Sequence, residues 1–96
     1  MESEYFEWDD AKAEANFRKH RVRFEHGAEA CEDPFAWLEL DDSEDYGEDR
    51  YRLVGRTLDG LVTVVFTERN GRNRIISARE ANDHEQRNYN RAAPKK

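Results

Sequence analysis

The chain has 96 residues, of which 40% are charged and 36% hydrophobic, and its formal net charge is −6. This length supports one small domain, residues 1–96, and no apolar run of about 18 residues is present to cross a membrane. The acidic N-terminus lacks an apolar signal segment, and the single cysteine, Cys31, cannot form an internal disulfide. We therefore expect a cytoplasmic protein.

Charge is distributed unevenly along the chain. Residues 25–49 contain eleven acidic residues and no Lys or Arg, whereas residues 50–96 contain eleven basic residues and five acidic ones. The basic half can contact phosphate locally, although the net negative charge opposes strong non-specific binding to nucleic acid. The acidic segment has two interpretations, a docking surface for a basic protein segment or a solubilising face.

The N-terminal half predicts two short helices flanked by strands. Residues 5–8 alternate in polarity, as in a short edge strand, and Asp9 or Asp10 caps a helix over about 10–20. A second helix follows over roughly 24–32, and Asp33-Pro34 ends it because the residue before a proline avoids the α region. Residues 35–40 alternate again and predict a strand, and an acidic loop spans 41–49.

The C-terminal half predicts an antiparallel meander followed by a helix. Asn70-Gly71 is a tight-turn dipeptide between strands 61–69 and 72–79, and Asp59-Gly60 joins this hairpin to a strand over 51–57. Asn82, with Glu85 three residues later, resembles a capping box that opens a helix over about 83–91. Residues 92–96 are expected to be a frayed tail.

The two turns also predict the strand register. With Asn70-Gly71 as loop residues, Phe66 lies opposite Ile75 and Val64 opposite Ser77; with Asp59-Gly60 as the other loop, Leu53 lies opposite Phe66. Side chains alternate between faces, so one face is expected to be packed under a helix. That face comprises Tyr51, Leu53, Gly55, Val62, Val64, Phe66, Ile75 and Ser77. The opposite face comprises Arg52, Val54, Arg56, Thr63, Val65, Thr67, Arg74 and Ile76. Strict alternation places Arg79 at the end of the packed face.

An ordered set of motifs over about residues 5–90 resembles the BrnT family, the ribonuclease toxins of type II toxin–antitoxin pairs. The set comprises Phe6-Glu-Trp-Asp9, Lys12, Asn16, Lys19-His20, Phe24, Asp33-Pro34, Glu48-Asp-Arg-Tyr51, Gly55-Arg56, Val64-Val-Phe66 and Arg74-Ile-Ile-Ser-Ala-Arg79. Two positions depart from the family pattern. Arg21 stands where the family usually has glycine, which costs stability if the position is left-handed, and Cys31 stands where a bulky aromatic is usual.

The resemblance implies a fold, an activity and partners. The fold is α+β and RelE-like, a small antiparallel sheet with two N-terminal helices and a C-terminal helix, the helices packing on one face. The activity is metal-independent RNA cleavage that inhibits translation. The partners are RNA, on or off the ribosome, and a BrnA-like ribbon-helix-helix antitoxin, which neutralises the toxin and alone contacts operator DNA. The rival interpretation is a non-catalytic module that binds an antitoxin.

RNA cleavage without metal needs cations that stabilise charge on phosphoryl oxygens and groups that move protons. Arg56 and Arg74 are the candidate catalytic cations, with Arg52 and Arg79 as RNA-binding residues, since guanidinium groups match phosphate geometry. Each arginine has an ordinary alternative: a solvated sheet face, or, for Arg79, a pair with Glu80 or Glu85. Lys19 is a further RNA-binding candidate.

Two residues are candidates for proton transfer. His20 has a reference pKa near neutrality, but it can equally cap the first helix. Glu68 lies beside the Asn70-Gly71 turn, where it serves either as a base or as a partner of Arg69 or Arg72. Tyr89, on the last helix, is more typical of the core than of a base-stacking site.

No metal or cofactor is expected. A calcium-loop frame starting at Asp41 fails because Tyr46 replaces its glycine and Arg52 its final glutamate. His and Cys residues do not cluster as zinc ligands do.

Overall fold

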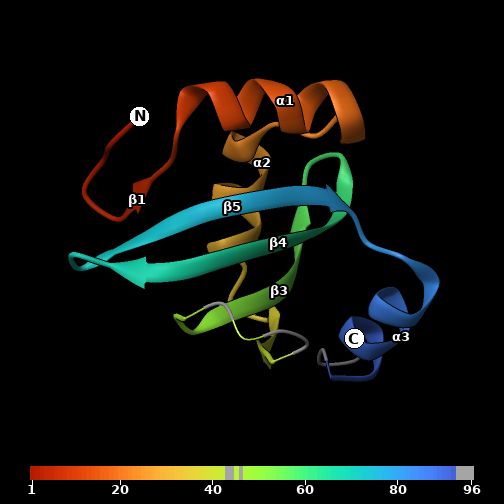
Figure 1. The fold of residues 1–96 in the computed structure, drawn as a ribbon. Coiled ribbons are helices and arrows are strands. Elements are labelled where there is room, and N and C mark those ends of the chain that lie inside the picture. The colour runs from red at the N-terminus through yellow and green to blue at the C-terminus, as the bar shows by residue number, and fades with distance from the viewer. Residues whose placement is uncertain (43–44, 46, 93–96) are drawn as a thin grey trace.

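The computed structural model describes residues 1–42, 45 and 47–92. Five strands and three helices follow one another in the order β1 (Phe6–Glu7), α1 (Asp10–His20), α2 (Phe24–Cys31), β2 (Trp37–Asp41), β3 (Arg50–Thr57), β4 (Gly60–Arg69), β5 (Arg72–Glu80) and α3 (Asp83–Ala92) (Figure 1). These bounds confirm the predicted α+β class and each predicted element to within about two residues. Ser43, Glu44 and Tyr46 of the predicted acidic loop, and residues 93–96 of the predicted tail, lie outside the described residues.

The five strands form one sheet in the order β1-β5-β4-β3-β2. The pairs β2–β3, β3–β4 and β4–β5 are antiparallel, whereas β1 runs parallel to β5, with Phe6 opposite Asn73. The expectation of an all-antiparallel sheet is therefore wrong at one edge. β1 precedes α1 in the chain and is not joined to β5 by a hairpin turn. The two strands can therefore run parallel.

The β4–β5 turn is the one predicted. Asn70 and Gly71 both have positive φ, 54° and 75°, as a two-residue turn of this type requires. The β3–β4 turn lies one residue earlier in the chain than predicted. Thr57 lies opposite Gly60, so the loop residues are Leu58 and Asp59 and not Asp59 and Gly60. Leu53 therefore lies opposite Val64, and Tyr51 lies opposite Phe66. This shift of two residues in the register leaves the face of every side chain unchanged.

A β-bulge changes the face of the last residues of β5. Phe66 lies opposite Ile75 as predicted, but Val65 lies opposite Ser77, so Ile76 is an extra residue in β5. Beyond it the alternation is inverted. Ala78 joins the core in place of Ser77, and Arg79, opposite Thr63, faces the other side of the sheet. The prediction that Arg79 belongs to the packed face was wrong because period-two alternation does not foresee a bulge.

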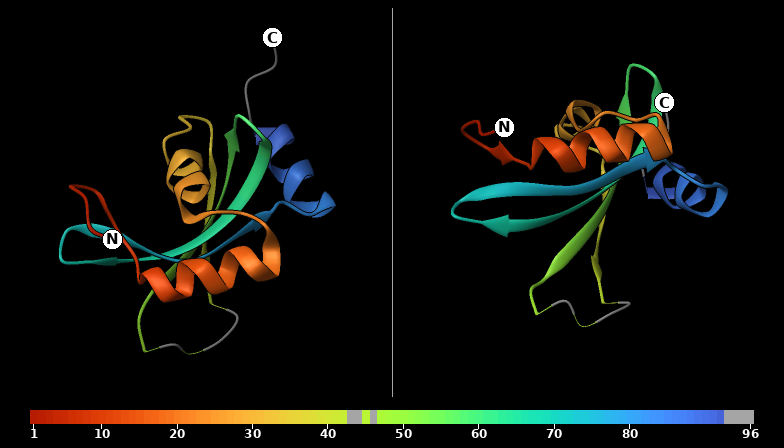
Figure 2. Two further views of the ribbon diagram at one scale, coloured as in Figure 1. Left: turned by 90° about the horizontal axis from the view of Figure 1, so that it is seen from above. Right: turned by 45° about the horizontal axis from the view of Figure 1, so that its top comes forward.

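The main core lies between one face of the sheet, α2 and α1. Its buried residues are Trp8, Val22, Phe24, Ala30, Leu53, Val62, Val64, Phe66, Ile75 and Ala78. In Figure 1, α2 passes behind β4 and β5, and both panels of Figure 2 show α1 lying along β5. Gly55 permits the close approach of α2, since a Cβ there would lie 2.2 Å from the carbonyl oxygen of Ala30.

The third helix packs on the opposite face, so the expectation that the helices share one face is wrong. Val54, Ala81 and Tyr89 form a second buried cluster, with Trp37 and Leu61 packed against it. The predicted capping box begins this helix: the Glu85 backbone N–H donates to Asn82 Oδ1 at 2.8 Å, and the Asn82 N–H donates to Glu85 Oε1 at 3.0 Å. Among the described helices, α3 alone packs on this face, and it contacts β3 and β2.

Helix α1 begins at the predicted cap and ends at a residue with strained backbone, as expected if Arg21 is left-handed. Asp9 caps it by accepting from the N–H of Lys12 at 3.0 Å. Arg21 ends it in the left-handed region, with φ of 59°. The one buried residue of α1 is Asn16, whose amide donates to the carbonyl oxygens of Val22 and Ala78 and accepts from the Ala78 N–H.

Candidate functional site

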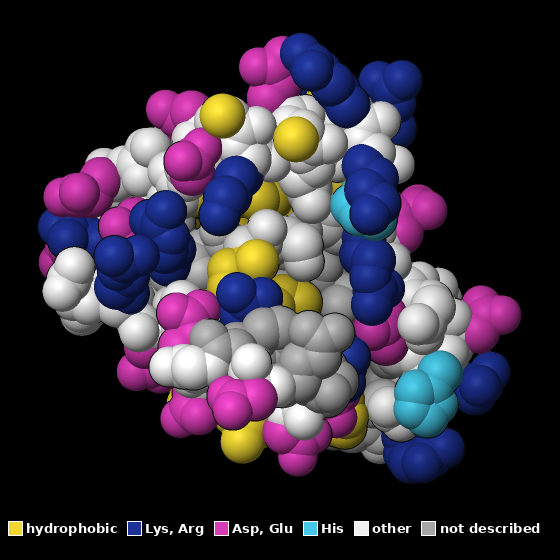
Figure 3. Space-filling view, viewed as in Figure 1, with side chains coloured by type: hydrophobic (Ala, Val, Ile, Leu, Met, Phe, Trp, Pro, Cys, Tyr) yellow, Lys and Arg dark blue, Asp and Glu magenta, His cyan; other side chains and the backbone are white. Residues whose placement is uncertain are grey.

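The four arginines predicted as site residues lie on the sheet face that α2 does not cover, where Arg50, Arg69 and Arg72 also lie by alternation, and we call the surface that the four form the arginine face. It comprises Arg52, Arg56, Arg74 and Arg79. Figure 3 views this side of the molecule and shows groups of Lys and Arg side chains at its left and right, with hydrophobic and further basic atoms between them. Three of the four were predicted to share this face, and the bulge in β5 adds Arg79.

Carboxylates from neighbouring strands hold two of these arginines. The Nε of Arg52 on β3 donates to Glu39 Oε1 on β2 at 2.8 Å. At the other side of the sheet, Arg74 Nη1 on β5 lies 3.4 Å from Glu7 Oε2 on β1. Glu7 is mostly buried, and its other oxygen, Oε1, has no hydrogen-bond partner among the residues described here. The carboxylates fix both guanidinium groups in place and neutralise part of their charge.

Arg79 belongs to a buried network at the start of α3. Its Nη1 and Nη2 donate to the two carboxylate oxygens of Glu85 at 2.7 and 2.9 Å, and the Thr63 hydroxyl donates to the same carboxylate at 2.9 Å. Burial alone would raise the pKa of Glu85, but Arg79, the Asn82 N–H and Thr63 hold this pKa below its usual range. Of the two partners left open for Arg79, the structure selects Glu85.

Arg56 is held through aromatic and backbone contacts. Its guanidinium carbon lies 5.6 Å from the ring centre of Tyr89, and no carboxylate of the described residues forms an ion pair with it. Its backbone N–H donates to Asp33 Oδ2 at 2.8 Å, and the Tyr89 hydroxyl donates to the same oxygen at 2.6 Å. Burial would raise the pKa of Asp33, but these donors hold it below its usual range. Tyr89 is 2% exposed and is a core residue, as expected.

The structure does not gather all the predicted site residues at one point. Glu68 follows Thr67 on β4, so it points to the face opposite Arg74, and it lines a hollow with Tyr51 and Asp49. His20 ends α1 and lines a different hollow with His26, whose Nε2 lies 3.4 Å from Asp59 Oδ2. The described residues therefore show Glu68 near the Arg74 end of β5 and His20 near its Arg79 end.

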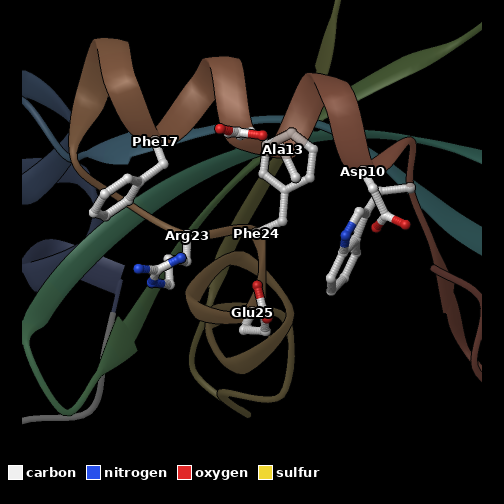
Figure 4. Close-up of a pocket in the computed structure, with 8 residues that line it drawn as sticks. Asp10, Ala13, Phe17, Arg23, Phe24 and Glu25 are labelled. Carbon is white, nitrogen blue, oxygen red and sulfur yellow. The ribbon is translucent and has the colours of Figure 1, made fainter.

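A groove outside the arginine face separates the start of α2 from α1. It is lined by Trp8, Asp10, Ala13, Glu14, Phe17, Arg23, Phe24 and Glu25 (Figure 4). Arg23 covers the ring of Phe17, with its guanidinium carbon 4.2 Å from the ring centre.

Lys19 is exposed in the last turn of α1. Neither Lys19 nor any of the groove residues reaches the arginine face through a contact that the structure records.

A metal-binding cluster and a membrane-spanning helix are both absent from the described part of the chain. No group of three or more His, Cys, Asp or Glu side chains in residues 1–42, 45 and 47–92 is arranged to hold a metal ion. Within the same residues, no helix is both long enough and apolar enough to span a bilayer.

The fold and this face define a small α+β protein with a mixed sheet and several arginines on one sheet face. Comparison with family sequence models matches residues 8–85 to the ribonuclease toxin BrnT of type II toxin–antitoxin systems. The chain belongs to this family. No curated protein matches it. Membership brings with it ribonuclease activity as the family's chemistry and an antitoxin as the family's kind of partner.

Sequence reasoning missed the residues that hold the arginines. Glu39, Glu7 and Asp33 were considered only as parts of strands, motifs or the acidic segment. Cross-strand pairing gives a signal for Glu39, since it lies directly opposite Arg52. Asp33 lies 23 residues before Arg56 and 56 before Tyr89, so only the tertiary fold brings these groups together.

Proposed function

We propose that this protein is a metal-independent endoribonuclease that inhibits translation in the cytoplasm and is neutralised by a BrnA-like ribbon-helix-helix antitoxin. The family match carries the ribonuclease class. The observation that supports this location of the site is the presence of Arg52, Arg56, Arg74 and Arg79 on one sheet face. Such a face offers fixed cations to an RNA backbone at its surface.

In the proposed reaction, the ribose 2′-OH attacks the adjacent phosphate and charge accumulates on the phosphoryl oxygens. Arg56 and Arg74 stabilise this charge, while Arg52, Arg79 and Lys19 bind flanking phosphates. Arg56 is the most available cation, because the other three guanidinium groups already contact carboxylates. For Arg74, the incoming phosphate competes with Glu7, whose contact at 3.4 Å is the longest of the three.

His20 and Glu68 are the candidates for proton transfer, and they lie near opposite ends of β5. Glu68 points to the face opposite Arg74, so the RNA backbone must bend around the edge of the sheet for Glu68 to act. Arg74 and Arg79 are five residues apart on one strand, so these ends are separated by roughly 16 Å. One phosphate therefore does not contact both ends, and only one of the two residues can act at a given scissile bond. The His20→Ala and Glu68→Ala variants decide between them, because only the acting residue will reduce cleavage by about 100-fold or more.

The test is growth on induction of the chain in a bacterial host. We expect wild type to arrest growth, Arg74→Ala to lose this effect, and co-expression of the antitoxin to restore growth. Arg18→Ala is the matched control, since Arg18 is an exposed arginine of α1 paired with Glu14 and lies outside the arginine face. Growth arrest that persists in a folded, expressed Arg56→Ala/Arg74→Ala variant would contradict the proposal.

The rival function is a non-catalytic module that binds an antitoxin and takes part in operon regulation. Its support is the net charge of −6 and the carboxylates beside three of the four arginines. This module would leave growth unaffected while still binding the antitoxin. A folded wild type that neither arrests growth nor cleaves RNA in a translating extract would favour it.

A further inference from the structure

The outer edge of β2 carries no further strand in the part of the chain that the structure describes. β2 ends the sheet, and among the described strands only β3 pairs with it. An edge strand presents a row of backbone N–H and C=O groups that can accept another strand. Natural sheets usually protect such edges with charged residues, prolines, bulges or a covering element.

Apolar side chains alternate with Glu39 and Asp41 along this edge. Leu38 and Leu40 are 54% and 52% exposed, and Phe35, just before the strand, is 52% exposed. Leu38 lies opposite Leu53 and Leu40 opposite Tyr51, both on the core face of β3. The apolar surface of the core therefore continues past β3 to the rim of the sheet, where the helices no longer cover it.

The surroundings of this rim are acidic. A hollow of about 450 Å³ lies next to the end of β2. It is lined by Leu40, Asp41, Asp42, Asp45, Gly47, Glu48 and Asp49. Arg50 partly offsets these carboxylates, since its Nε lies 3.3 Å from Glu48 Oε2, but no Lys or Arg occurs between residues 25 and 49. An apolar strand edge beside five acidic residues is complementary to a segment that is both apolar and basic.

We propose that the edge of β2 binds an extended segment of the antitoxin, with alternating apolar and basic side chains, as a sixth strand of the sheet. Main-chain hydrogen bonds supply the affinity, Leu38 and Leu40 receive the apolar side chains, and the acidic hollow receives the basic ones. The identity of the occupant as an antitoxin rests on the proposed function. A second copy of the chain does not fit, since pairing two β2 edges brings two acidic rims together.

The first test uses a synthetic probe and involves no RNA. A short, capped, fluorescent peptide in which valine and lysine alternate is titrated with the protein at low salt, followed by anisotropy. We expect binding that weakens with added salt, slower hydrogen exchange in residues 37–40, and at least tenfold weaker binding to Leu38→Lys. Leu58→Lys is the matched control, because Leu58 is 96% exposed in the β3–β4 turn, away from this edge.

Three results would overturn the proposal. They are absence of peptide binding to wild type, equal binding to Leu38→Lys and Leu58→Lys, or equal binding of a peptide with glutamate in place of lysine. A wild-type dimer that Leu38→Lys converts to a monomer, seen by light scattering, would assign the edge to a second copy.

The second test uses growth arrest and separates this inference from the proposed function. Leu38 lies off the arginine face, so Leu38→Lys is expected to arrest growth as wild type does but to escape neutralisation by the co-expressed antitoxin. Leu58→Lys is expected to remain neutralised. Normal neutralisation of Leu38→Lys by the antitoxin would contradict docking at β2 without affecting the ribonuclease proposal. If the wild type does not arrest growth, the ribonuclease proposal is contradicted, while the peptide assay still tests the β2 edge.

Discussion

Removing the carboxylate of Glu85 is expected to destabilise the protein by about 3 kcal/mol. Glu85 is 5% exposed and caps α3, and its loss leaves the hydroxyl of Thr63, which is 1% exposed, without this acceptor. A lost cap costs about 1 kcal/mol and an unsatisfied buried hydroxyl about 1 kcal/mol or more. We add about 1 kcal/mol for the ion pair, because the Arg79 side chain is 34% exposed and can be solvated by water.

Urea unfolding of Glu85→Ala measures this free energy. The matched control is Glu80→Ala, an exposed residue close by, for which we expect a change within about 0.5 kcal/mol. A melting experiment should show a decrease of about 12 °C or more for Glu85→Ala. Equal unfolding free energies for the two variants would refute the network as a stabilising unit.

The same network predicts the pH dependence of stability. The folded-state pKa of Glu85 is lowered, so its carboxylate contributes stability above the unfolded-state pKa, and this contribution disappears as pH falls through the folded-state pKa. Glu85→Gln lacks this titration. The difference in unfolding free energy between wild type and Glu85→Gln should therefore be largest near neutral pH and decrease in acid, and a difference independent of pH would contradict the assignment.

Four further predictions concern single positions. Asn16→Ala should lower the unfolding free energy by about 2 kcal/mol or more, because backbone groups of Val22 and Ala78 lose their buried partner; a change below about 0.5 kcal/mol would contradict this. Gly55→Ala should be destabilising by about 2 kcal/mol or more, since its Cβ would overlap the Ala30 carbonyl, whereas Gly47→Ala, with open space around it, tests only backbone strain. Arg21→Gly should raise stability by about 1 kcal/mol, because glycine adopts the left-handed conformation without penalty; an unchanged melting temperature would refute this. Burial, followed by the charge of Glu32, raises the pKa of the Cys31 thiol to about 12, so it should react with a thiol reagent far more slowly in the folded protein than in urea at pH 8, and equal rates would refute it.

Local patterns predicted most of the secondary structure. Asn70-Gly71 specified the β4–β5 turn, and Asn82 with Glu85 specified the start of α3, because each motif satisfies its own backbone groups within a few residues. The faces of β3 and β4 followed from alternation alone. These features need no information from distant parts of the chain.

Non-local packing set what the sequence did not predict. The bulge at Ile76 moved Arg79 to the arginine face, and no turn or glycine in the sequence marks it. The parallel pairing of β1 with β5 depends on how α1 packs. Likewise, the approach of Asp33 to Tyr89 arises from the docking of α3 on the second sheet face, which periodicity cannot reveal.

The candidate site was predicted only in part. Arg52, Arg56 and Arg74 share a face as expected, whereas the carboxylates that hold Arg52 and Arg74 come from strands β2 and β1. The catalytic roles assigned to all these residues, and to His20 and Glu68, stay predictions that activity measurements must decide.

The most direct measurement incubates purified protein, freed of antitoxin, with total RNA in the presence of EDTA. Wild type and Arg18→Ala are expected to cleave the RNA, whereas folded Arg56→Ala and Arg74→Ala are expected to lose at least 100-fold in rate. Cleavage that EDTA abolishes would contradict the metal-independent mechanism. Undiminished cleavage by both folded arginine variants would show that the arginine face is not the site of the chemistry.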